Sequence, residues 1–418
     1  MKKVLFISHD ASRTGAPMLL LNFLRWFKEN ADTPFEILLG RGGELEKDFS
    51  ALAPTSVFYR EGEGPEAIRK HNIIRRVTRR LGINNPASRI RRRMAGSNIG
   101  LIYSNTSTNG NILQALSFLD CPVISHIHEL SYSIDLRSDK FDYVKERTTH
   151  FIACSQAVKD NLVNRHNISP DNISVIHEFT PTPDENAIST QHLLCHELKL
   201  PEDAFIVGSS GTRHWRKGPD LFIQLASCVL DKLRAFDKMN QRIRSNVIPA
   251  CFKRESTLLD PRFRGDDNLH FVWIGGGDKE QNDAIGRAVA ETGLKEQVHF
   301  LEAKQDPLGY FADFDVFALT SREDPFPLVC LEVASLGKPV LCFDKSGGEP
   351  EFVEKDCGFV VPNLDVDAMA DRVIELYKDR EFLRQLGQNA AKKVRNRHTL
   401  EANAPKIAAI IEKYLGNK

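Results

Sequence analysis

Two acidic residues, Asp324 and Glu332, flank a Pro-Phe-Pro-Leu turn with seven residues between them. Pro327 in this turn suits the first turn of a helix, because proline already has a helical φ and the N–H that it lacks would find no partner there. The free N–H groups of such a turn bind anions or hydroxyl groups. The pattern therefore predicts a pocket with two carboxylates and several amide donors. The alternative is an ordinary loop and helix start with solvated acids.

The stretch TSREDPFPLVCLEVASLGKPVL around these two acids resembles the acidic motif of the retaining glycosyltransferases of family 4. That family has the GT-B fold, an α/β fold in which two Rossmann-like domains with parallel sheets face each other across a cleft. Its motif usually has two glutamates around a Gly-Phe-Gly turn, whereas this chain has Asp324, with Glu323 beside it as the alternative acid.

The resemblance also implies a role for each part of the motif. Glu332 would bind the ribose hydroxyls of a nucleotide sugar. The hydroxyls of the donor sugar would be bound by Asp324 and by the turn residues Phe326, Pro327 and Leu328.

A lysine is the next candidate, because a Gly-Ser loop after a buried strand leads to Lys217 at the start of the next helix. A departing nucleoside diphosphate develops negative charge, and a site without a metal must hold it with cations and backbone donors. Lys217 matches the family's diphosphate lysine, but the place of the family's arginine, six residues earlier, is occupied by Gly211. Arg213 or Arg216 would take that role; the alternative is a surface cluster of basic side chains.

Two glycine loops resemble further parts of the family's donor site. Gly347, Gly348 and Glu351 match its Gly-Gly-x-x-Glu turn, and glycine lets the backbone approach a bound group. Near the N-terminus, a strand, a glycine loop and a helix follow one another in the layout that binds phosphate in doubly wound sheets. The resemblance implies that Gly15 and Ala16 approach the donor diphosphate, although the loop is not a GxGxxG and a plain strand–helix turn is the alternative.

The segment SHIHEL places His126 and His128 on the same side of a strand by simple alternation. His128 has three interpretations: a metal ligand, a catalytic base, or a residue that hydrogen-bonds the donor sugar. HxHE lacks the helix of the zinc-protease motif, and two histidines do not complete a coordination sphere. The resemblance implies that His128 contacts the transferred sugar, with His126 as second choice. The polar loop 103–110 is suited to an acceptor.

The elements that must position these residues are strands alternating with helices, which is typical of α/β folds with the site at the carboxyl ends of parallel strands. The 418 residues suffice for two or three domains. We expect a Rossmann-like acceptor domain over 1–185, a linker over 186–203 and a Rossmann-like nucleotide-sugar domain over 204–385. By the resemblance, C-terminal helices over 386–418 cross back to the first domain.

An anomalous stretch interrupts the second domain over about 233–268. It contains VIPACFKRESTLLDPRFRGDD, which resembles peptides translated from dispersed repetitive elements of bacterial genomes. Long insertions in surface loops cost little free energy. We expect a disordered or loosely helical insertion without a catalytic role.

A basic segment from Arg69 to Arg93 holds ten lysine or arginine residues, and no acid occurs between Ala67 and Leu119. Apolar residues lie between the basic ones, roughly on one helical stripe, as in helices that bind anionic membrane surfaces. The alternative is a solvated outer face of the domain. Nucleic-acid binding is not favoured, because aromatic residues do not interleave the basic ones.

The composition indicates a globular protein without special charge, since basic and acidic residues number 56 each. The eight cysteines lie mostly in apolar runs without a CxxC pair, which favours buried reduced thiols in the cytosol. The start MKKVLFIS indicates a first strand, and no segment has the length needed to span a bilayer. We expect the protein to be cytoplasmic or peripheral on the inner face of the membrane.

Together with the resemblance, these residues predict a glycosyltransferase that moves a hexose from a nucleotide diphosphate sugar to a hydroxyl acceptor, in cell-surface polysaccharide or lipopolysaccharide synthesis. That the enzyme is retaining is implied by the resemblance alone. The acceptor would be a glycan or a lipid-linked precursor. The Asp-x-Asp pairs at 313–315 and 365–367 are typical of element ends. The resemblance implies a family that needs no such metal, so no cofactor or metal is expected. The alternatives are a sugar-nucleotide epimerase or phosphorylase on the same fold, and a catalytically silent relic that only binds ligand.

Overall fold

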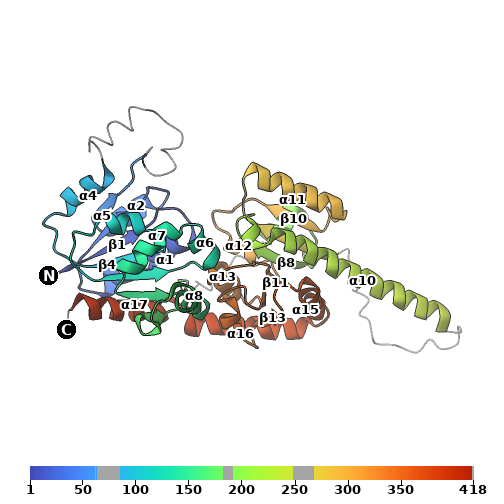
Figure 1. Cartoon of the computed structure of the whole chain (residues 1–418). Coiled ribbons are helices and arrows are strands. Elements are labelled where there is room, and N and C mark those ends of the chain that lie inside the picture. Colours follow the sequence, from blue (N-terminus) through green and yellow to red (C-terminus); the bar gives the residue numbers. More distant parts are fainter. Residues whose placement is uncertain (62, 64–84, 182–191, 248–267, 417–418) are drawn as a thin grey trace. The chain divides into compact units, whose positions relative to one another are not determined.

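The computed structural model describes residues 1–61, 63, 85–181, 192–247 and 268–416, with only the backbone for 240–247. The chain divides into two units (Figure 1). Unit 1 comprises Met1–Thr182, Pro325–Leu328 and Asn396–Lys418, and unit 2 comprises Pro183–Asp324 and Val329–Arg395. In the described ranges, no helix combines the length and the hydrophobicity needed to cross a membrane.

Unit 1 is built on a parallel sheet of seven strands in the order β3-β2-β1-β4-β5-β6-β7. The strands are β1 (Lys3–Ser8), β2 (Phe35–Leu39), β3 (Thr55–Val57), β4 (Ile99–Asn105), β5 (Val123–Ile127), β6 (His150–Ala153) and β7 (Ile173–Val175). The helices are α1 (Gly15–Asn30), α2 (Glu46–Leu52), α4 (Pro86–Met94), α5 (Gly110–Ala115), α6 (Ser131–Asp135), α7 (Ser138–Arg147), α8 (Gln156–His166) and α17 (Leu400–Leu415). The strands are apolar and buried, as expected where helices cover a parallel sheet.

The C-terminal helix α17 is part of unit 1, where it packs against α1 and β4. Its buried residues Ile407, Ile411 and Leu415 belong to the same hydrophobic core as α1. A β-bridge between Thr180 and Thr399 joins the end of the first long segment to the start of α17.

Unit 2 has a parallel sheet of six strands in the order β10-β9-β8-β11-β12-β13. The strands are β8 (Phe205–Ser210), β9 (Leu269–Ile274), β10 (Val298–Leu301), β11 (Val316–Leu319), β12 (Val340–Phe343) and β13 (Gly358–Val361). The helices, two of which end or begin in unit 1, are α9 (Leu193–Leu198), α10 (Pro219–Val247), α11 (Lys279–Thr292), α12 (Leu308–Phe311), α13 (Leu328–Ser335), α14 (Glu349–Val353), α15 (Val366–Lys378) and α16 (Arg380–Arg397).

Local sequence signals fix several of these boundaries. Asp278 and Gln281 form a reciprocal capping box at the start of α11, which then ends at Gly293 in the left-handed conformation. The Asp-x-Asp pairs do serve element ends: Asp315 accepts a hydrogen bond from the amide of Ile206, and Asp365 caps α15. The expected linker contains α9, and residues 182–191 lie outside the described part of the chain.

Helix α10 continues as regular α-helix through the first part of the expected insertion, up to Val247. Leu233 is buried in the unit 2 core, whereas Phe236 and Met239 further along are exposed. Beyond Leu233 the helix therefore extends away from the sheet of unit 2 (Figure 1). The repeat-like residues 248–267 lie outside the described residues.

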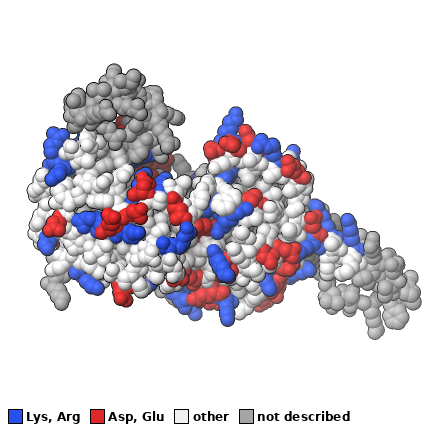
Figure 2. Space-filling view, in the orientation of Figure 1, with Lys and Arg blue, Asp and Glu red and all other residues white. Residues whose placement is uncertain are grey.

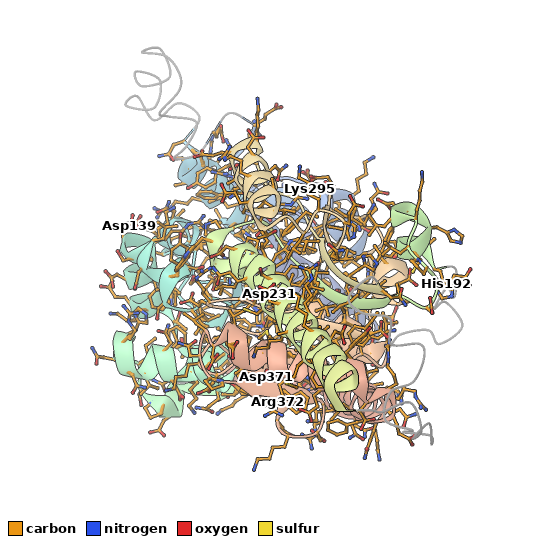
Figure 3. The ribbon with its side chains drawn as sticks, turned by 90° about the vertical axis from the view of Figure 1, so that its right-hand side faces the viewer. Asp139, His192, Asp231, Lys295, Asp371 and Arg372 are labelled. Carbon is orange, nitrogen blue, oxygen red and sulfur yellow. The ribbon has the colours of Figure 1, made fainter. Side chains whose placement is uncertain are left out.

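Helices α10 and α15 pack side by side in unit 2, as the labels Asp231, Asp371 and Arg372 mark in Figure 3. Lys232 of α10 forms ion pairs with Asp367 and Asp371 of α15. Basic and acidic side chains also alternate over the face seen in Figure 2. This mixture agrees with the equal numbers of basic and acidic residues in the chain.

Most of the basic segment, residues 69–84, lies outside the described residues. Its last part forms α4, in which Ile90 and Met94 are buried. Arg89 on this helix pairs with Glu63 and donates to the carbonyl oxygen of Phe58. In the described part of the chain no cysteine forms a disulfide, and all but Cys228 are buried.

Candidate functional site

The structure joins Lys217 to Asp324 in unit 2. The Lys217 Nζ atom donates to Asp324 Oδ2 at 2.5 Å, and Ser321 Oγ donates to the same oxygen at 3.0 Å. Lys217 ends the short 3-10 helix η3 (Trp215–Lys217), and Gly218 follows in the left-handed conformation at φ +72°. A Cβ atom at Gly218 would lie 2.0 Å from the carbonyl oxygen of Thr320, so glycine is needed for this approach.

The two arginine candidates beside Lys217 have different surroundings. Arg216 donates to the carbonyl oxygen of Glu323 and lies 3.8 Å from Asp324 Oδ1. Arg213 instead donates to Asn282 Oδ1 at 2.8 Å and to the carbonyl oxygen of Leu301 at 3.0 Å. Arg216 is therefore the arginine that shares Asp324 with Lys217.

The glycine turn after β12 holds the backbone of Asp324. The Asp324 amide donates to the carbonyl oxygen of Ser346 at 2.6 Å, and the Gly348 amide donates to the carbonyl oxygen of Asp324 at 3.2 Å. A Cβ atom at Gly347, where φ is +143°, would lie 1.6 Å from that oxygen of Asp324. The close approach that requires glycine here is thus to the chain's own acidic residue.

Glu349, the residue after these glycines, was missed by the sequence analysis. Its side chain is fully buried, and neither carboxyl oxygen has a nitrogen or oxygen partner within the described residues. Burial raises the pKa of Glu349 well above its usual range, and the nearby charge of Asp324 acts in the same direction. Burial also raises the pKa of the neighbouring Cys330 thiol.

Glu332, the second acid of the motif, lies on α13 and is partly buried. Burial raises the pKa of its carboxyl group to about 7. The helix begins at Leu328, one residue later than the position that was expected from Pro327. Among the described residues no hydrogen bond or ion pair joins Glu332 to Lys217.

The turn residue Phe326 belongs to unit 1, where its buried ring stacks on His177 and His398 at centroid distances of 5.1 and 5.5 Å. The side chain therefore anchors the turn, and only the backbone is left for a ligand. A Cβ atom added at Gly15, the first residue of α1, would lie 3.8 Å from Leu328 Cδ1. Leu328 is thus in van der Waals range of the glycine loop.

His128 is held between two side chains of unit 1. Its Nδ1 atom lies 2.6 Å from Glu178 Oε1, and its Nε2 atom lies 2.9 Å from Asn105 Oδ1. Asn105 also donates to the carbonyl oxygen of Ala16 at 2.8 Å. Glu178 was missed by the sequence analysis, since it follows 50 residues after His128 in a segment without a recognisable motif.

The pKa values of the two neighbouring histidines, His126 and His128, are shifted in opposite directions. Burial alone would lower the pKa of His128, but the facing Glu178 carboxylate outweighs it and the net shift is upward. Burial lowers the pKa of His126 well below its usual range, and its Nδ1 atom lies 2.7 Å from the hydroxyl of Tyr103. His128 is therefore the member of the pair that is more readily protonated.

The metal interpretation of His128 has a geometric basis. Ligand atoms of His128, Cys154 and Glu178 lie within 4.8 Å of one another. A metal would need a neutral imidazole, whereas the ion pair with Glu178 favours the protonated ring. The contacts of His128 thus fit a hydrogen-bonding role better than metal ligation.

Comparison with known proteins gives two family matches, one in each half of the chain. Residues 51–182 match the family described as Glycosyltransferase Family 4, and residues 258–393 match the family described as Glycosyl transferases group 1. With the two parallel-sheet domains, these matches define the class of GT-B glycosyltransferases. The chain belongs to family 4 of that class, so the predicted family and fold class are confirmed.

Individual relatives are distant. The chain is 23% identical over 246 residues to D-inositol 3-phosphate glycosyltransferase of Corynebacterium efficiens. The aligned region covers 56% of this chain and 50% of that protein. The chain is 30% identical over 119 residues to N-acetyl-alpha-D-glucosaminyl L-malate synthase of Bacillus anthracis. This aligned region covers 28% of the chain and 31% of that protein. The chain thus aligns with about half the length, or less, of these curated relatives.

Solved structures match over nearly the whole chain. Anabaena HepE in complex with UDP-glucose has a TM-score of 0.73 at 19% identity, covering 99% of this chain and 100% of that one. Sucrose-phosphate synthase from Thermosynechococcus elongatus has a TM-score of 0.72 at 18% identity, covering 100% of both chains. At this level of identity the likeness establishes the fold.

Proposed function

We propose that this protein is a retaining glycosyltransferase that moves a hexose from a nucleotide diphosphate sugar to a hydroxyl acceptor. The observation that carries the proposal is the convergence of Lys217 and Arg216 on Asp324 in unit 2. Two cations that share one carboxylate are suited to receive a diphosphate, because the ligand brings more negative charge than Asp324 alone. The donor class also agrees with HepE of Anabaena, whose structures contain UDP and UDP-glucose.

Each residue of unit 2 has one role in this proposal. Lys217, assisted by Arg216, stabilises the negative charge on the departing diphosphate, so the proposal includes no metal. Glu332 accepts hydrogen bonds from the ribose hydroxyls, and Asp324 accepts hydrogen bonds from the sugar. The backbone of Gly347 and Gly348 contributes further polar contacts to the donor. The turn 326–328, which belongs to unit 1, also offers its backbone to the donor in this proposal.

The reaction itself is a substitution at the anomeric carbon of the donor. The bond from that carbon to the diphosphate oxygen breaks, and a bond to the acceptor oxygen forms on the same face. The acceptor proton moves to the departing diphosphate, whose charge the lysine stabilises. In unit 1, protonated His128 keeps Glu178 at Nδ1 and turns its Nε2 N–H from Asn105 Oδ1 to a hydroxyl of the transferred sugar.

A donor screen tests the proposal. Nucleotide sugars are added one at a time, and the thermal midpoint and the products are followed. A true donor at 100 times its Kd stabilises the folded state by about 2.7 kcal/mol. The product should keep the anomeric configuration of the donor in its NMR spectrum; an inverted product would contradict retention. An epimerised free nucleotide sugar would indicate an epimerase, and binding without turnover would indicate a silent protein.

The acceptor and the location complete the proposal. We place the protein at the cytoplasmic face of a membrane, where it glycosylates a cell-surface polysaccharide or lipopolysaccharide precursor. The support is the basic segment from Arg69 to Arg93 and the similarity to the capsular polysaccharide glycosyltransferase CapM of Staphylococcus aureus, which is 27% identical over 92 residues. Charge reversal at Arg75, Arg76, Arg79 and Arg80 should abolish sedimentation with anionic vesicles. Equal sedimentation of the variant and the unmodified protein would contradict the membrane role.

A further inference from the structure

Unit 1 contains a pocket of about 170 Å³ at the carboxyl ends of its first strands. His9 and Asp10 follow β1, Gly40 and Arg41 follow β2, and Asn109 lies in the loop after β4. Such a volume is far above the ~10–15 Å³ that a single water molecule needs. The carboxyl ends of parallel strands are the usual place for a ligand in folds of this type.

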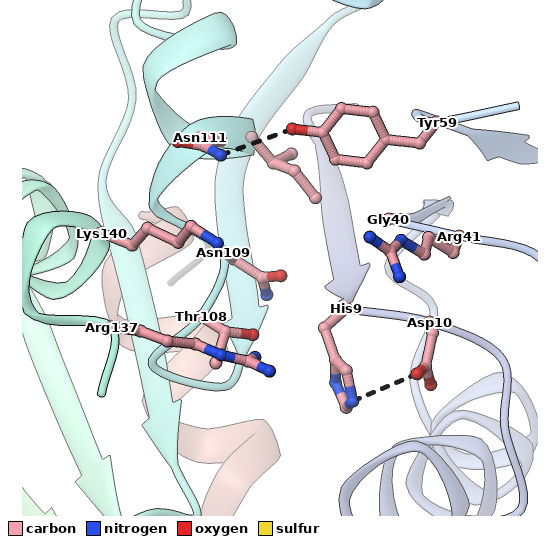
Figure 4. Close-up of a pocket in the computed structure, with 11 residues that line it drawn as sticks. His9, Asp10, Gly40, Arg41, Tyr59, Thr108, Asn109, Asn111, Arg137 and Lys140 are labelled. Atoms are coloured by element: carbon pink, nitrogen blue, oxygen red, sulfur yellow. Dashed lines mark hydrogen bonds and ion pairs between the residues drawn. The ribbon is translucent and has the colours of Figure 1, made fainter. Parts of the chain in front are cut away.

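The pocket is lined by three basic side chains, Arg41, Arg137 and Lys140. Figure 4 shows Arg137 and Lys140 entering from one side and Arg41 from the other. Arg137 precedes α7 and Lys140 lies on it, and neither has a carboxylate within ion-pair distance in the described ranges. The Arg137 guanidinium and the Lys140 ammonium group therefore reach the pocket without a carboxylate partner among the described residues.

Asp10 is the acid in this lining, and its carboxylate is already engaged. It lies 3.5 Å from His9 Nε2 and accepts hydrogen bonds from both the amide and the hydroxyl of Ser12. Elsewhere in unit 1, Arg25 forms an ion pair with Asp48 and Arg165 forms one with Asp135. The excess positive charge is thus a property of the pocket.

Neutral polar atoms in the same lining also lack partners. His9 Nδ1 and Asn109 Oδ1 are buried without a hydrogen bond among the described residues. Asn109 is 1% exposed, and its amide nitrogen donates to Ser104 Oγ at 3.1 Å. Buried polar atoms are normally paired, so these two atoms point to a polar ligand with hydroxyl groups.

We propose that this pocket binds an oxyanion, a phosphate or a carboxylate, carried by the acceptor, and that the enzyme therefore prefers an anionic acceptor. Arg137 and Arg41 bind the oxyanion in the planar, two-pronged manner that guanidinium groups favour, and Lys140 adds a point charge. His9 and Asn109 bind hydroxyl groups next to it. The assignment of the oxyanion to the acceptor substrate rests on the proposed transferase function, whereas the binding of an oxyanion in the pocket does not.

Thermal unfolding of the full chain in potassium phosphate, potassium acetate and potassium chloride at equal ionic strength tests the proposal. Phosphate or acetate should raise the midpoint by several degrees over chloride, and the stronger of the two identifies the class of oxyanion. The shift should be clearly smaller in the double variant Arg137→Gln, Lys140→Gln, where only the general stabilising effect of phosphate on folded proteins remains. It should remain in Lys145→Gln, a control on the same helix α7 whose lysine pairs with Asp142 outside the pocket lining.

A second comparison separates this proposal from the donor site of unit 2. In Lys217→Ala the oxyanion shift should persist while nucleotide binding is lost, and the double variant should show the opposite pattern. Arg41→Gln serves as an independent variant if the double variant does not fold. Equal midpoints in all three salts, or an unchanged shift in both pocket variants, would overturn the proposal.

Discussion

At the scale of single residues, Glu349 is a buried acid that unit 2 stabilises poorly. Its carboxyl group has no nitrogen or oxygen partner in the described part of the chain, and its pKa is raised by burial. The thiol of Cys330 is a weak donor to this carboxyl group. A buried polar group that is so poorly paired costs about 1–3 kcal/mol, so Glu349→Met should raise the free energy of unfolding by up to about this amount. Exposed Glu291 on α11 provides the control Glu291→Met, which should change little.

The gain from Glu349→Met should depend on pH. The folded state keeps the Glu349 proton at pH values where the unfolded chain, with a pKa of about 4.3, has lost it. The free energy of unfolding of the unmodified protein therefore falls as pH rises above that value, because the unfolded chain releases the proton more readily. The increase in the free energy of unfolding caused by Glu349→Met should then be larger at pH 8 than at pH 5. Urea denaturation at both pH values measures this difference; equal gains would contradict the buried neutral acid.

Glu332 should make donor binding dependent on pH near neutrality. Its pKa is raised to about 7, and only the ionised carboxylate is a full acceptor for two ribose hydroxyls. The affinity for a nucleotide sugar, whose diphosphate diester does not titrate near pH 7, should therefore rise between pH 6 and pH 8. Calorimetry should show a flat profile for Glu332→Gln; the same slope in that variant would assign the effect to another group.

The residue scale also shows which parts of the site a sequence can reveal. Lys217 and Asp324 were predictable because each belongs to a local pattern with fixed spacing. Glu178 and Glu349 were not, because the partner of the first and the burial of the second are set by tertiary packing. Arg216 could be distinguished from Arg213 only by the side-chain contacts of each.

At the scale of elements, α17 should contribute strongly to the stability of unit 1. Ile411 is fully buried in the core that α17 shares with α1, whereas the neighbouring Ile410 is only partly buried. Ile411→Ala should lower the free energy of unfolding by about 2–5 kcal/mol, because it removes apolar contacts and leaves a cavity. Denaturant titration should show a clearly smaller loss for Ile410→Ala, and equal losses would contradict the packing of this helix.

The end of α10 should be dispensable. Leu233 is the last residue of α10 in the unit 2 core, and Phe236 beyond it lies under the ammonium group of Lys378. Replacing residues 240–265 with a short glycine-serine linker keeps both contacts. The variant should unfold at a midpoint close to that of the unmodified protein and bind nucleotide sugar equally well; a chain that no longer folds would show that the insertion is structural.

Element types were easier to predict than their limits. Alternating apolar runs and helical patterns predicted the parallel sheets, because buried parallel strands are apolar along their whole length. The insertion was expected to be disordered or loosely helical, and its first part is a regular continuation of α10 to Val247. The lysine, arginine, glutamine and methionine residues of these last turns favour helix. The stretch 233–268 was interpreted as an insertion. The helix propensity of its residues up to Val247 accounts for the helical structure of its first part.

At the scale of the whole molecule, the chain forms two units with separate hydrophobic cores. The acidic motif lies where the chain passes from one unit to the other, since Asp324 belongs to unit 2 and the turn 325–328 to unit 1. Such chain crossings have no local sequence signature. They were expected for the C-terminal helices from the family resemblance, not from the residues themselves.

The most direct test of the central claim is the rate of glycosyl transfer after Lys217→Ala. This variant should lose transfer by about 100-fold to 1,000-fold, as expected when a group that stabilises the charge of a departing oxyanion is removed. Lys232→Ala is the matched control, because Lys232 pairs with Asp367 and Asp371 in the same unit without contact to Asp324. Transfer by Lys217→Ala at the same rate as by Lys232→Ala would contradict the account.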